Sequence, residues 1–78
     1  MFDKQDLVSV ANMKMPFGKY KGRSLIDLPE EYLLWFDKKG FPENKLGMLM
    51  QLSLEIQING QKEIILPLKN DSSYRHTT

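Results

Sequence analysis

The stretch from Met15 to Arg23, MPFGKYKGR, gathers residue types that bind phosphates and bases. Lys19, Lys21 and Arg23 lie within five residues of one another, and Tyr20 lies between the two lysines. Cations at this spacing can meet successive phosphates, and a phenol ring can stack on a base. Charge combined with stacking is the usual basis of nucleic-acid binding that tolerates many sequences. The stretch therefore indicates a candidate contact for DNA or RNA.

The charge pattern supports this interpretation. The whole chain carries 11 basic and 10 acidic residues, but no acid occurs between Leu7 and Ile26. Local charge can form a patch even on a nearly neutral protein. The alternative is a solvated turn whose lysines only keep an edge strand from aggregating. On the first interpretation the candidate contact residues are Lys14, Lys19, Tyr20, Lys21 and Arg23.

Two glycines shape this stretch. Gly18 and Gly22 flank the tip KYK, and the sequence predicts a β-hairpin over residues 15–28 with a glycine-assisted turn. The run from Gly18 to Ser24 is one residue shorter than a phosphate-binding P-loop, and Arg23 stands where that motif has lysine. We therefore reject a nucleotide-binding loop.

Residues suited to catalysis are scarce. The chain has no cysteine, and its one histidine, His76, lies in a polar terminal segment. Asp27, Glu30 and Glu31 could be magnesium ligands, but they fit better as acids that complement the positive end of a helix. We therefore expect no enzyme activity, no metal, no cofactor and no small-molecule substrate.

Local signals predict two short helices. Asp3 is a good N-cap for a helix ending near Asn12. A second helix is expected between Pro29 at its first position and Gly40 at its exit. Its aromatic and leucine side chains at spacings of three and four are expected to anchor the core, and they are Tyr32, Leu33, Trp35 and Phe36.

Residues 44–59 allow two interpretations. Alternation of apolar and polar residues from Leu52 to Ile58, followed by the dipeptide NG, is typical of a hairpin, whereas the length suits a helix. A helix here would be apolar over most of its circumference, so it would have to be buried or shared with another chain. We favour the helix and expect a homodimer or a protein partner as an alternative function. The expected interaction face is Leu46, Met48, Met50 and Leu54.

The elements together predict an α+β fold, with an N-terminal helix, a hairpin and two further helices, the last of which could be a second hairpin. Residues 1–69 form one expected domain, and residues 70–78 an expected disordered polar tail. No run of about 18 apolar residues occurs, and the N-terminus does not resemble a signal peptide. We therefore expect no membrane contact and a cytoplasmic location.

The motifs MPFGKYKG, DLPEEYLLWF, GFP and LG resemble those of small bacterial proteins grouped as putative quorum-sensing-regulated virulence factors. The resemblance runs from about Leu7 to Leu68. It implies a small α+β domain and a helix over residues 44–59, but no activity. The first half is also similar to the C-terminal accessory domain of exodeoxyribonuclease X-like proteins. That similarity implies a role in nucleic-acid binding for Phe17, Gly18, Lys19, Tyr20, Lys21 and Gly22.

Overall fold

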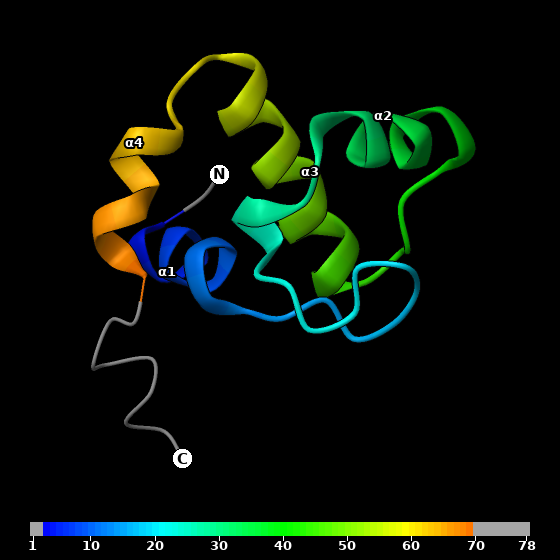
Figure 1. Ribbon diagram of the computed structural model, residues 1–78, viewed down its shortest axis with the longest axis horizontal. Coiled ribbons are helices and arrows are strands. Elements are labelled where there is room, and N and C mark those ends of the chain that lie inside the picture. Colours follow the sequence, from blue (N-terminus) through cyan, green and yellow to red (C-terminus); the bar gives the residue numbers. More distant parts are fainter. Residues whose placement is uncertain (1–2, 70–78) are drawn as a thin grey trace.

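The computed structural model describes residues 3–69, so the expected tail at residues 70–78, with His76, lies outside the described residues. Within these described residues the chain forms four α-helices and two 3₁₀ turns (Figure 1). No helix within the described range is long and apolar enough to cross a membrane. In chain order the elements are α1 (Lys4–Asn12), η1 (Leu25–Asp27), α2 (Glu30–Lys39), α3 (Lys45–Ile58), α4 (Lys62–Ile65) and η2 (Leu66–Leu68).

The expectation of an α+β fold is wrong. Over residues 3–69 the only β pairing is one isolated antiparallel bridge between Lys14 and Ser24. The chain does reverse there, with the Met15 amide donating to Arg23 at 2.8 Å and the Gly22 amide donating to Met15 at 2.8 Å. A ladder cannot extend from this bridge, because Pro16 has no amide hydrogen and the chain enters η1 directly after Ser24. The expected hairpin is therefore an irregular loop.

The local helix signals are confirmed, except that Pro29 is the N-cap of α2 and not its first helical residue. The Asp3 carboxylate accepts the Asp6 amide at 3.0 Å, and the Asp6 carboxylate accepts the Asp3 amide at 3.2 Å, which completes a capping box for α1. α2 begins directly after Pro29, and Gly40 caps its C-terminus with a positive φ of 110°. Both helix ends therefore depend on interactions that are local in the sequence.

α3 is the helix that the other elements surround. It contacts α1, α2 and η1, and Figure 1 shows α2 on one side of it with α1 and α4 on the other. The helix interpretation of residues 44–59 is thus confirmed, and the alternative second hairpin is wrong. Leu52, Leu54 and Ile56, which alternate with polar residues as in a strand, are all buried although they lie on different faces of the helix. The residues buried along α3 are Leu46, Gly47, Leu49, Met50, Leu52, Ser53, Leu54 and Ile56.

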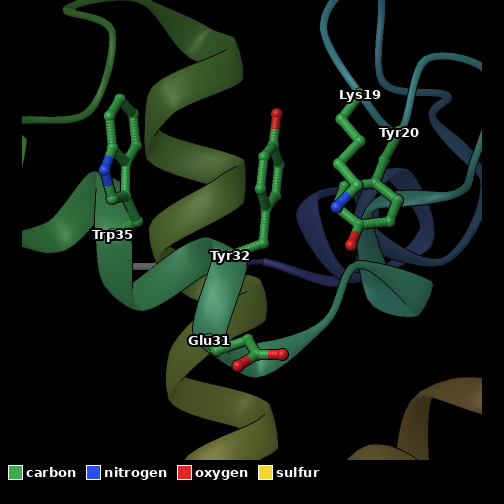
Figure 2. A pocket seen from close by; sticks show the side chains of 5 residues that line it. All are labelled: Lys19, Tyr20, Glu31, Tyr32 and Trp35. Atoms are coloured by element: carbon green, nitrogen blue, oxygen red, sulfur yellow. The ribbon is translucent and has the colours of Figure 1, made fainter.

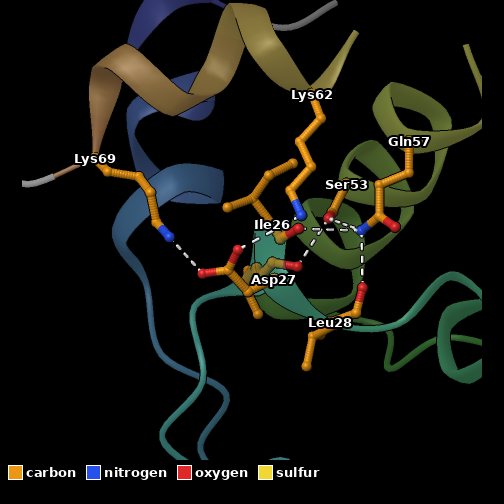
Figure 3. A network of polar contacts seen from close by, with 8 residues as sticks. Ile26, Asp27, Leu28, Ser53, Gln57, Lys62 and Lys69 are labelled. Carbon is orange, nitrogen blue, oxygen red and sulfur yellow. Dashed lines mark hydrogen bonds and ion pairs between the residues drawn. The ribbon is translucent and has the colours of Figure 1, made fainter. Parts of the chain in front are cut away.

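Two polar side chains of α3 donate hydrogen bonds to the backbone of η1 and of Leu28, the residue that follows it (Figure 3). The fully buried Ser53 hydroxyl donates to the Leu25 carbonyl at 2.9 Å, and the Gln57 amide donates to the Leu28 carbonyl at 2.9 Å. The Leu25 carbonyl also accepts the Leu28 amide at 3.2 Å within the turn, whereas the Leu28 carbonyl follows the turn, and carbonyls that a short turn leaves unpaired are costly to bury. These hydrogen bonds therefore let an irregular segment pack against the centre of the core.

The C-terminal segment closes over α1. The Asn12 amide donates to the Leu68 carbonyl at 2.8 Å, and Ile65 is buried in the core. Asp27 in η1 forms ion pairs with Lys62 at 3.7 Å and Lys69 at 2.5 Å (Figure 3). These contacts join the C-terminal segment to α1 and to η1.

The first turn of α3 lies against the backbone of the preceding loop. Asn44 caps this turn by accepting the Gly47 amide at 3.1 Å. A Cβ atom added to Gly47 would lie 1.7 Å from the Pro42 carbonyl oxygen, which is far inside van der Waals contact. Gly47 is therefore required by close packing between two backbones, and this explains the GFP and LG motifs together.

We predict that Gly47→Ala destabilises the protein by about 3 kcal/mol or more, because the new methyl group must push α3 and the Pro42 loop apart. Helix propensity alone would predict the opposite sign, a gain of about 1 kcal/mol. Urea unfolding followed by circular dichroism measures the difference. Gln51→Ala, at an exposed position of α3, is the control and is expected to change stability by less than about 0.5 kcal/mol. A neutral or stabilising effect of Gly47→Ala would contradict the close approach.

An ion pair joins the beginnings of α1 and α3. The Lys45 ammonium donates to the Asp6 carboxylate at 2.8 Å. This hydrogen bond, together with the one from the Asp3 amide, lowers the pKa of the Asp6 carboxyl below its ordinary value of 3.8. The folded protein therefore favours the charged form of Asp6 more strongly than the unfolded chain does.

This pKa shift predicts a pH-dependent contribution to stability. Because the folded-state pKa is the lower one, the contribution is present above pH 3.8 and is lost as the pH falls through the folded-state value. Asp6→Asn should lower the unfolding temperature at pH 7, and the difference from wild type should shrink as the pH falls below 3.8 and through the folded-state pKa. Glu55→Gln, at an exposed position, is the control. A deficit of Asp6→Asn that stays constant down to pH 2 would contradict the ion pair.

Candidate functional site

The expected cations lie on one loop, residues 14–23, which we call the basic loop. Gly18 and Gly22 take positive φ values of 81° and 90°, a region that favours glycine, and this winds the loop into two successive turns. The amides of Lys21 and Arg23 close these turns on the carbonyls of Gly18 and Tyr20. The two glycines therefore determine the path of the backbone in this loop.

All four cations of the basic loop are exposed, but they do not point to one spot. The Lys19 ammonium lies 5.5 Å from the centre of the Tyr20 ring, and the Arg23 guanidinium lies 4.9 Å from it. Lys14 lies at the base of the loop, with its ammonium 3.4 Å from the Ser24 hydroxyl. The structure thus brings Lys19 and Arg23 together beside the Tyr20 ring, whereas Lys14 lies at the base of the loop near Ser24.

Tyr20 differs from the expected exposed ring. It is half-buried and packs edge-to-face on Tyr32 of α2, with 4.7 Å between ring centres. Gly18 lies close to the same partner, since a Cβ atom there would be 3.0 Å from the Tyr32 hydroxyl. With two cations beside it and Tyr32 against it, Tyr20 acts as the anchor that docks the basic loop on α2.

The ring that the sequence interpretation missed is Trp35. The aromatic stripe of α2 was expected to anchor the core, yet Leu33 is the one residue of α2 that is buried, and Trp35 is 54 % exposed. The two side chains are two residues apart, about 200° around a helix, so they cannot share a face. The spacing of Leu33 and Trp35 in the sequence therefore already indicates that only one of them can face the core. The expectation holds for Leu33 and is wrong for Trp35.

A pocket of about 400 Å³ connects the basic loop to Trp35. Figure 2 shows Tyr32 standing between Trp35 on one side and Lys19 with Tyr20 on the other. The Phe36 ring is nearly perpendicular to both Tyr32 and Trp35, at centre distances of 5.2 and 5.0 Å, and fixes where these two rings stand. The residues lining the pocket are Lys19, Tyr20, Glu31, Tyr32 and Trp35.

Glu31 adds a negative group to the base of this pocket. It lies in the first turn of α2, where the helix dipole favours an acid. Its carboxylate takes part in no ion pair or side-chain hydrogen bond with the described residues 3–69. The pocket therefore offers aromatic faces, one cation and one hydrogen-bond acceptor.

The face of α3 expected to bind a partner is not exposed. Leu46, Met50 and Leu54 are buried in the core, and Met48 is half-buried against it. Most of the apolar circumference of α3 is covered by this chain's own elements, although Ile58 at its C-terminal end is 56 % exposed. This removes the reason for expecting an interaction surface there.

No group of three or more histidine, cysteine, aspartate or glutamate side chains within residues 3–69 could hold a metal ion. Asp27 pairs with Lys62 and Lys69, and Glu30 and Glu31 lie in the first turn of α2. Asp27 is therefore held in ion pairs, and Glu30 and Glu31 lie where acids interact favourably with the dipole of α2.

Comparisons with known proteins place the chain in a family. It is 59 % identical over 68 residues to the uncharacterised protein YpeB of Escherichia coli K12, covering 86 % of this chain and 94 % of that protein. It matches the YpeB protein of Escherichia coli O157:H7 to the same extent. No solved structure matches. The family model described as putative quorum-sensing-regulated virulence factor matches residues 3–68, and the chain belongs to that family.

Proposed function

We propose that this domain is a non-enzymatic module that binds single-stranded nucleic acid through the basic loop and Trp35. The observation that carries the proposal is the pocket that joins Lys19 to the exposed Trp35 ring. A binding site for single strands needs cations for the phosphates and an open aromatic face for a base. Both are within one continuous surface here.

The cations supply the attraction to the backbone. Lys19, Lys21 and Arg23 are exposed on a loop whose own sequence contains no acid. Lys19 and Arg23 are held beside Tyr20, so little side-chain freedom is lost when they meet a phosphate. Three phosphate contacts by such groups give a binding constant that falls with salt.

Trp35 supplies the stacking surface. An exposed indole can stack on any unpaired base, and this contributes about 1–3 kcal/mol for each base. In a duplex the base faces are already covered by their neighbours, so stacking on Trp35 favours single strands over duplexes. The alternative, a protein-interaction module that uses α3, has lost its support because that face is buried.

We predict that Lys19→Glu with Lys21→Glu weakens binding of a fluorescein-labelled dT octamer at least about tenfold, as measured by anisotropy at low salt. Lys38→Glu with Lys39→Glu, at the end of α2, is the control, because it changes the net charge equally. The wild-type affinity should fall with salt with a logarithmic slope of about −2, as three contacts to a single strand require.

A second pair of variants tests the contribution of base stacking on Trp35. Trp35→Ala should weaken binding about 5- to 100-fold, whereas Leu34→Ala, an exposed neighbour that does not line the pocket, should leave binding unchanged. The single tryptophan also reports directly, since its emission should be quenched when the octamer binds. Equal affinities of the wild type and the double glutamate variant, or tighter binding of duplex than of single strands, would overturn the proposal.

A further inference from the structure

Glu31 is a polar group of the pocket that attraction to phosphates does not explain. A carboxylate repels the phosphate backbone, yet it lies in the same pocket as Lys19 and Trp35. Figure 2 shows it at the foot of the pocket, below the Tyr32 ring. It has no partner among the described residues, so its two oxygens are available as acceptors.

We propose that the pocket holds one unpaired base and that Glu31 makes it selective for guanine. This inference rests on the proposed function and names the base which that same site prefers. A base stacked on Trp35 would have the Glu31 carboxylate for its edge, with the Lys19 ammonium beyond the Tyr32 ring for its phosphate. The site thus offers a cation for the phosphate of a nucleotide and, at a different place, a carboxylate for the edge of its base.

Hydrogen-bond chemistry singles out guanine. A carboxylate has only acceptors, and its two oxygens can take two parallel N–H donors. The Watson–Crick edge of guanine offers two neighbouring donors, N1–H and the N2 amino group. Adenine and cytosine place a ring-nitrogen acceptor beside their amino group, and thymine and uracil flank one donor with two carbonyls. One carboxylate oxygen would therefore face an acceptor on every base except guanine.

The expected preference is modest because Glu31 is exposed to water in the unbound protein. A good bidentate contact discriminates by about 5- to 150-fold, and the exposed carboxylate should lie near the lower limit. Stacking on Trp35 removes water from one side of the base, which strengthens the contact in the complex.

The test uses four labelled octamers that are all thymine except at one central position, which carries G, A, C or T. Anisotropy with the wild-type chain should give about fivefold tighter binding of the G octamer than of the A octamer. Glu31→Gln should abolish or reverse this ratio, because the glutamine amide pairs one acceptor with one donor and so suits adenine. Glu30→Gln makes the same charge change one residue away, outside the pocket lining, and should keep the preference.

The outcomes separate this inference from the proposed function. Equal binding of all four octamers by the wild type, with loss of binding in the Lys19 and Lys21 double variant, overturns the guanine site and leaves the proposed function intact. A guanine preference that survives Glu31→Gln also overturns the guanine site. Absence of binding to every octamer overturns both. A preference lost in Glu31→Gln and kept in Glu30→Gln supports the assignment.

Discussion

α3 is apolar around almost its whole circumference, and this obliges the rest of the chain to enclose it. Fourteen residues form this helix, and eight of them are buried. Each large apolar side chain fully removed from water contributes about 1.5–3 kcal/mol, so the packing around α3 outweighs any single surface contact. In this chain of 78 residues, α1, α2 and η1 contact α3 directly, and the C-terminal segment packs on α1. The polar contacts of Ser53 and Gln57 then make it possible to bury an irregular segment against the same helix.

The position of the candidate site follows from this enclosure. α2 contributes one fully buried residue, Leu33, to the core, so the faces that carry Glu31 and Trp35 turn outward. The basic loop has no ladder to hold it, and it docks through Tyr20 on Tyr32 instead. The same aromatic contacts that hold the loop in place therefore also line the pocket. The candidate site therefore lies where the basic loop meets the outward face of α2.

The sequence predicts the helix ends well because they depend on neighbours in the chain. Asp3 and Gly40 act through hydrogen bonds or backbone angles within a few residues, so their types and spacing suffice. The hairpin prediction failed because a two-stranded ribbon needs long-range pairing, which Pro16 and η1 interrupt. The burial of Met50 within its own chain could not be foreseen, because an apolar helix indicates that a cover exists but does not say which chain supplies it. The exposure of Trp35 follows from its position two residues after Leu33, which places the two side chains on opposite faces of α2.

Native-state hydrogen exchange tests most directly whether enclosure of α3 organises the fold. The account predicts that the backbone amides of Leu49, Ser53 and Ile56 exchange most slowly of all, with a protection free energy equal to that of global unfolding, at any protein concentration. Faster exchange in α3 than in α1 would show that α1 holds the more stable structure. Protection of α3 that rises with protein concentration would show that a second copy provides the cover. The first result would contradict the central role of α3 in the fold, and the second would contradict the claim that this chain alone buries it.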